Sequence, residues 1–105
     1  MCAGGSSTRL FHRPYRAGHY LRRHSDTYED RVFGLVFFIS DSWQHRDGGQ
    51  LVVEYPDGRV DVLDPEPATV VALPIAPGYW HMVAEVSDTD WVRHSVAAHF
   101  GVEPR

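Results

Sequence analysis

The sequence predicts an all-β fold, because its apolar residues fall in short β-branched and aromatic runs separated by turns that contain proline or glycine. We distinguish about eight such runs and find no segment with a helical period, so few or no helices are expected. The chain has 105 residues, enough for a single domain with one modest core. These observations favour one β-sandwich or barrel.

The expected strands follow one another along the chain, and each is bounded by a turn or a break. Residues 1–7 are small and rich in glycine and serine, and we expect them to form a flexible lead before a domain at 8–105. Residues 8–15 are mixed in character, and Pro14 limits ladder pairing there. The other expected strands are 19–26, 32–39, 50–55, 59–63, 69–73, 79–86 and 90–100.

Residues 32–39 form the clearest of these elements, a run of β-branched, aromatic and aliphatic side chains broken only by Gly34. Such a run is typical of a central strand that is buried on both faces. Pro56-Asp57-Gly58 predicts a hairpin turn between the strands at 50–55 and 59–63.

The composition narrows the possible classes of function. The net charge is −4 and there is no basic stripe, so nucleic acid is not an expected partner. No apolar run approaches the roughly 20 residues that cross a bilayer, and the N-terminus lacks a secretory signal, so we expect no membrane association and a cytoplasmic location. The single cysteine, Cys2, excludes an internal disulfide framework. All 10 basic residues are arginine, so any fixed carboxylate clamp must use an arginine.

Three side chains can form a metal site. Residues i and i+2 of a strand share a face, so His24 and Asp26 can bind one ion together, and His81 in a later strand can supply a third ligand. Two histidines and one carboxylate, with open positions opposite, are the facial triad of non-haem Fe(II) oxygenases. Ordinary interpretations also exist: a polar strand end in water for His24-x-Asp26, and a histidine bonded to a backbone carbonyl for His81.

Arg93 and Ser95 share a strand face by the same alternation. If that face is the interior, the buried guanidinium needs an anion. A bound carboxylate would satisfy it, and so would a structural salt bridge, for which Glu85 is a candidate.

In their order along the chain these elements resemble the 2-oxoglutarate/Fe(II)-dependent dioxygenase superfamily, and most closely its prolyl-4-hydroxylase-type subgroup. The resemblance covers nearly the whole chain from Thr8 to Gly101. The matching elements are Tyr15-x-x-Gly18-x-x-Leu21-x-x-His24-x-Asp26, Arg31 before the apolar strand 32–39, Gly48-Gly49-Gln50-Leu51, a hairpin, a proline-flanked strand, His81-x-Val83 and Arg93-x-Ser95.

The resemblance implies a double-stranded β-helix, a jelly-roll fold similar to that of cupins, with iron at one open end. It implies that Fe(II) is bound by His24, Asp26 and His81. It also implies that 2-oxoglutarate pairs through its distal carboxylate with Arg93, accepts a hydrogen bond from Ser95 and is reached by the hydroxyl of Tyr15.

The implied reaction is hydroxylation of an aliphatic carbon in an amino acid, a peptidyl residue or a small metabolite, with release of succinate and CO2. Asp26 is a carboxylate where halogenating relatives have a small residue, which favours hydroxylation. Arg31 and Trp43 lie in segments expected near the open end and can touch substrate, although surface packing is the favoured alternative for both. Trp80 and Trp91 are expected in the core. No role is assigned to His12, His19, His45, His94 and His99.

Members of this family usually carry helices before the core, and this chain starts about where the core begins. It can therefore be a minimal oxygenase, a fragment, or a chain whose exposed apolar sheet is covered by a second copy or by a partner subunit. The competing class is a truncated or degenerate non-catalytic β-barrel binding domain. A metal-binding cupin is the weaker alternative, because Pro77-Gly78-x-x-His81 resembles the second cupin motif but His24-x-Asp26 departs from the first, which requires His-x-His.

Overall fold

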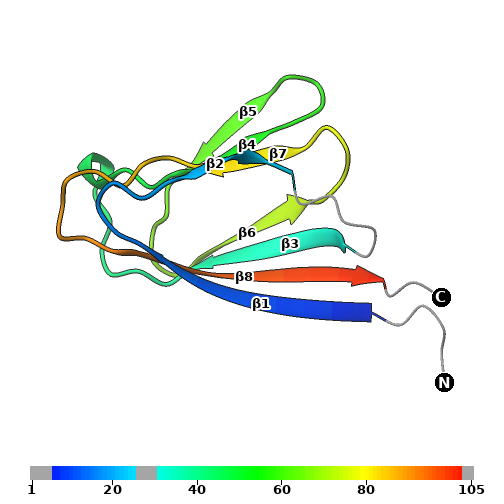
Figure 1. Ribbon diagram of the computed structural model, residues 1–105, viewed down its shortest axis with the longest axis horizontal. Helices are drawn as coiled ribbons and strands as arrows, with labels where there is room; N and C mark the ends of the chain where they lie inside the picture. Colours follow the sequence, from blue (N-terminus) through cyan, green and yellow to red (C-terminus); the bar gives the residue numbers. More distant parts are fainter. Residues whose placement is uncertain (1–5, 26–30, 103–105) are drawn as a thin grey trace.

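The computed structural model describes residues 6–25 and 31–102, which form a double-stranded β-helix, as the family resemblance implied. Its two four-stranded sheets lie in two layers, and all of the strand pairings described are antiparallel (Figure 1). Sheet A has the order β1 (Ser6–Tyr15), β8 (Arg93–Val102), β3 (Arg31–Phe38) and β6 (Thr69–Pro74). Sheet B has the order β2 (Leu21–His24), β7 (Trp80–Val83), β4 (Leu51–Glu54) and β5 (Val60–Leu63).

Helical structure in the described residues is limited to one 3-10 turn, η1 (His45–Asp47), in the connection between β3 and β4. The all-β prediction is therefore confirmed. Within 6–25 and 31–102, no helix is long and apolar enough to cross a bilayer.

Strand β1 begins earlier than the sequence predicted. It starts at Ser6, inside the expected lead at 1–7, because Ser6 pairs with Val102 at the far end of β8. The strand also runs through Pro14, which lies opposite His94. Because β1 is an edge strand of sheet A, a residue without a backbone N–H is tolerated there.

Strand β3 lies in the centre of sheet A, between β8 and β6, as its apolar sequence predicted. The expectation that both of its faces are buried is wrong. Phe38 points between the sheets and is 0% exposed, whereas Phe33 on the opposite face is 41% exposed. Leu10 and Val70 are exposed on the same outer face, so sheet A presents an apolar surface in the part of the chain that the structure describes. A second copy or a partner subunit that covers this surface stays a prediction.

The core lies between the two sheets. It is formed by Tyr15, Phe38, Leu51, Val53, Leu73, Val83 and Val86. Trp91 packs against this cluster, as predicted. Trp80 does not: it alternates with the inward-facing His81 on β7, lies on the outer face of sheet B, and has the guanidinium carbon of Arg23 4.0 Å from its ring centroid.

Replacing Phe38 by alanine should lower the free energy of unfolding by about 3–5 kcal/mol, because loss of a fully buried ring leaves a cavity between the sheets. Ile39→Ala is the matched control, since its side chain is 54% exposed and its loss should cost less than about 0.5 kcal/mol. Urea denaturation of the two variants measures the difference. Equal destabilisation would contradict the directions assigned to the two side chains.

Candidate functional site

A cavity of about 340 Å³ lies between the two sheets and is lined from both of them. Strands β1 and β8 of sheet A contribute one wall, and β2 and β7 of sheet B contribute to the opposite one. Residues from distant parts of the sequence therefore meet in one place. The predicted site residues that line this cavity are Tyr15, His24, His81, Arg93 and Ser95.

Arg93 is buried at this site, with only 2% of its surface exposed. Its Nε donates to the carbonyl oxygen of Gly49 at 2.8 Å, and one terminal nitrogen donates to Ser95 Oγ at 3.1 Å. Its guanidinium carbon lies 5.2 Å from the ring centroid of Tyr15 and 5.3 Å from that of Phe38. These contacts hold the guanidinium plane in place and leave part of its donor fork available to an anion.

Arg93 forms no ion pair with the described carboxylates, and Glu85, the partner that the sequence left open, is exposed. Burial lowers the pKa of Arg93 to about 10. The side chain therefore stays cationic at neutral pH, in surroundings where a charge without a counter-ion is costly. A carboxylate ligand is the group that this arrangement fits.

Gly49 allows the backbone to approach Arg93. Its φ of 75° lies in the left-handed region that favours glycine. A Cβ at this position would lie 3.2 Å from Arg93 Cδ and 3.3 Å from the ring of Trp91. Because Gly49 has no side chain, its backbone can approach closely enough for its carbonyl oxygen to accept a hydrogen bond from the guanidinium group of Arg93.

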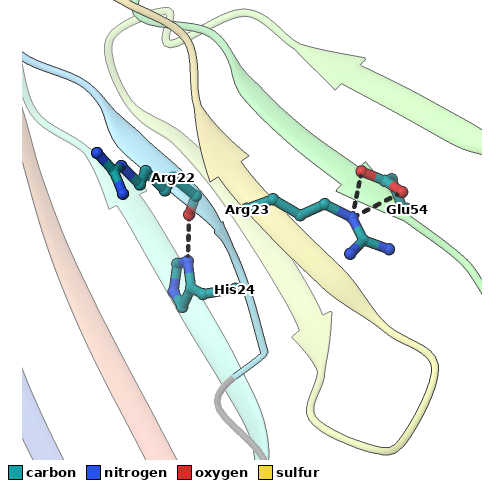
Figure 2. Close-up of polar contacts among 4 residues, drawn as sticks. All are labelled: Arg22, Arg23, His24 and Glu54. Atoms are coloured by element: carbon teal, nitrogen blue, oxygen red, sulfur yellow. Dashed lines mark hydrogen bonds and ion pairs between the residues drawn. The ribbon is translucent and has the colours of Figure 1, made fainter.

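His24 and His81 lie side by side on neighbouring strands of sheet B. They are opposite one another in the β2–β7 register, and their ring centroids are 4.1 Å apart with the planes inclined at 65°. His24 Nδ1 donates to the carbonyl oxygen of Arg22 at 2.8 Å (Figure 2), which places the lone pair of the neutral ring on Nε2. An imidazole oriented through one nitrogen in this way presents the other to a metal ion.

A β-bulge in β2 determines the direction of His24. Leu21 pairs with Val83 and His24 pairs with His81, so the four residues 21–24 of β2 lie opposite the three residues 81–83 of β7. Regular alternation would send Leu21 and His24 to opposite faces, yet both line the cavity. The extra residue turns His24 inward, as bulges do beside many functional sites.

Arg23 ties this short strand to the rest of sheet B from the outside. Its Nε donates to both carboxylate oxygens of Glu54 on β4, at 3.1 and 3.0 Å (Figure 2). The guanidinium group of Arg23 lies over the ring of Trp80 on β7, the strand that separates β2 from β4. The contact is partly exposed and contributes no more than about 1 kcal/mol, but it spans three strands and restrains the strand that carries His24.

The structure describes the side chain of only one of the three other predicted site residues. Asp26 lies outside the described residues, and only the backbone of Arg31 is described, at the start of β3. Trp43 does not line the cavity, and its Nε1 donates to the Gly48 carbonyl at 2.8 Å. The roles of all three stay predictions. Within 6–25 and 31–102 there is no group of three or more histidine, cysteine and acidic side chains that could hold a metal, and the predicted third ligand is Asp26.

Three further aromatic or polar side chains of the cavity lining were missed in the sequence: Phe11 and Arg13 on β1, and His99 on β8. Strand alternation is the signal that could have found them, since positions 11 and 13 share a face with Tyr15, and position 99 shares a face with Arg93. The long β1–β8 pairing extends this wall well beyond the predicted residues.

Fold and site together define a jelly-roll protein with a buried arginine and a pair of histidines in one cavity. A sequence model of the 2OG-Fe(II) oxygenase superfamily matches residues 10–101, and the chain belongs to this superfamily. A search of curated proteins found no match.

Several solved structures share the fold. A prolyl-4-hydroxylase from Pseudomonas putida aligns with a TM-score of 0.82 and 25% identity, over 93% of this chain and 53% of that one. An oxidoreductase of the 2OG-Fe(II) oxygenase family from Burkholderia pseudomallei aligns with a TM-score of 0.76 and 24% identity, over 91% and 43%. A prolyl hydroxylase from Trichoplax adhaerens, solved with a hypoxia inducible factor peptide fragment, aligns with a TM-score of 0.79 and 18% identity, over 92% and 44%. The chain thus spans about half the length of these proteins.

Gly49→Ala should reduce the affinity for 2-oxoglutarate about tenfold or more, because the new Cβ displaces Arg93 and weakens a charge-assisted hydrogen bond. Gly58→Ala is the matched control: Gly58 has a similar φ of 88°, but a Cβ there meets nothing within 4 Å. Both variants should lose about 1–2 kcal/mol of stability through backbone strain. Calorimetric titration with 2-oxoglutarate separates them, and an equal loss of affinity would show that strain rather than contact with Arg93 controls binding.

Proposed function

We propose that this chain is an Fe(II)- and 2-oxoglutarate-dependent dioxygenase that hydroxylates an aliphatic carbon of an amino acid, a peptidyl residue or a small metabolite. The net reaction is R–H + O2 + 2-oxoglutarate → R–OH + succinate + CO2. The observation that carries the proposal is a buried cation, Arg93, which has no carboxylate partner among the described residues and shares its cavity with the paired histidines His24 and His81.

Arg93 would bind the distal carboxylate of 2-oxoglutarate. Ser95 Oγ accepts a hydrogen bond from Arg93, so its own hydrogen can turn toward the same carboxylate. The ring of Tyr15 lies beside the guanidinium group, where its hydroxyl can reach the cosubstrate. All three side chains are buried, so their interactions with an anion would be little screened by water.

His24 and His81 would hold Fe(II), with Asp26 as the third ligand predicted from the sequence. Imidazole nitrogen and carboxylate oxygen are the donors that suit this metal, so the residues fit it. When bound, the iron supplies the centre at which dioxygen oxidises both 2-oxoglutarate and the substrate C–H bond. The protein contributes the orientation of the ligands: the bulge and the Arg22 carbonyl direct His24, and β7 holds His81 opposite to it.

The walls between these two groups are aliphatic. Leu21, Leu51 and Val83 line the cavity and would keep water away from the reacting atoms. The Pseudomonas putida structure is described as a prolyl-4-hydroxylase, so a prolyl substrate belongs to the candidates. A second copy of the chain or a partner subunit that covers the exposed apolar face of sheet A is also part of the proposal.

Anaerobic titration with Fe(II) and 2-oxoglutarate tests this function directly. A visible metal-to-ligand charge-transfer band should appear in the native protein and be lost in His24→Ala, which removes a ligand, and in Arg93→Ala, which removes the carboxylate anchor. His94→Ala should keep the band, because His94 lies on β8 next to Arg93 but outside the cavity lining.

Succinate formation in air, dependent on both Fe(II) and 2-oxoglutarate, then measures turnover. A folded protein that gives neither the band nor succinate would overturn the proposal. A non-catalytic β-barrel binding domain would then be the better account of this chain.

A further inference from the structure

The wall formed by β1 and β8 carries a second group of side chains beyond the proposed cosubstrate anchor. Arg13, Phe11 and His99 all line the cavity. The guanidinium carbon of Arg13 lies 6.0 Å from the ring centroid of Phe11, and the rings of Phe11 and His99 are 5.3 Å apart between centroids. An aromatic ring is therefore flanked by two nitrogen-bearing side chains.

The position of His99 depends on a glycine in the neighbouring strand. Gly34 lies opposite His99 in the β3–β8 register, and a Cβ there would lie 3.2 Å from His99 Cδ2. Glycine in the interior of a strand normally weakens it. Here the missing side chain provides the space that the imidazole ring occupies at the cavity wall.

The charge of the cavity favours an anionic ligand beyond the cosubstrate. Two arginines line it, and none of the described lining residues is acidic. Arg93 is buried and bonded to Gly49 and Ser95, whereas Arg13 is exposed and makes no ion pair in the described part of the chain. Arg13 lies opposite Ser95 in the β1–β8 register, and its charge has no acidic partner among the described residues.

We propose that Arg13, together with Phe11 and His99, binds a carboxylate of the primary substrate, so that the substrate is an acid and not its neutral amide. This inference rests on the proposed function and names the substrate class for the same cavity. Arg13 offers a planar donor fork that matches a carboxylate, and His99 forms part of the cavity wall next to Phe11. Phe11 provides an apolar surface for the aliphatic part that carries the C–H bond.

Matched pairs of N-acetyl aliphatic amino acids and their amides test this inference, because the members of each pair differ only in the charge of one end. Binding is measured by calorimetry, under anaerobic conditions, to the protein loaded with Fe(II) and 2-oxoglutarate. We expect at least one acid to bind about tenfold more tightly than its amide. Arg13→Gln should abolish this preference, and Arg13→Lys should restore part of it.

Arg16→Gln is the control variant, because Arg16 is an exposed arginine near the end of β1 that does not line the cavity. It should keep the full preference for the acid. The inference is overturned if no pair shows a preference for the acid, or if the preference persists in Arg13→Gln, which would place the carboxylate elsewhere.

The charge-transfer band keeps this test separate from that of the proposed function. If the band forms and no acid is preferred, the substrate inference alone fails. If the band does not form, the dioxygenase proposal fails, and the acid and amide pairs are compared on the apoprotein, where the same two outcomes decide the role of Arg13.

Discussion

The burial of one positive charge constrains much of this structure. Arg93 lies between two sheets whose contacts are otherwise largely apolar, and a guanidinium group is stable there only when its donors are met. The Gly49 carbonyl and Ser95 Oγ meet some of them, and the rings of Tyr15 and Phe38 lie close to its guanidinium carbon. Arg93 also lines the cavity, where a ligand can meet its other donors. A fold that only needed stability would place an apolar side chain here, so the cost of this charge is best explained by the ligand that it can bind.

The histidine pair has a different physical origin, in backbone irregularity and not in burial. Regular pairing of β2 with β7 would present Leu21 and His24 to opposite sides, and the bulge between them lets both face inward. A bulge loosens the ladder of a strand that has only four residues. The contact between Arg23 and Glu54, which crosses β7 over Trp80, supports this strand from the outer surface, where it does not interfere with the cavity.

Much of this arrangement could be predicted from the sequence. The apolar runs and turns predicted the order of the strands along the chain, and strand alternation predicted that Arg93 and Ser95 share a face. These two predictions succeeded because each depends only on residues that are close together in the sequence. The bulge could not be predicted, because an extra residue in a strand depends on how its partner pairs. The exposure of Phe33 and the position of Trp80 were missed for another reason: an apolar side chain indicates a tendency to be buried, but not whether another element covers it. His99 was predictable from alternation and was overlooked because its partners lie on other strands.

The pairing of β1 with β8 has a consequence for how the protein folds. It joins the two described strands that lie furthest apart in the chain, so that His12 and His94 are neighbours although 82 positions separate them. Contacts of such long range form only after the entropy of closing a long loop has been overcome, and they are associated with slow folding. Tyr15 and Arg93 face each other across this same pairing. During synthesis, the pairing that brings Tyr15 and Arg93 together can therefore form only after β8 has left the ribosome, so binding of an anion at Arg93 would report that β1 and β8 have paired.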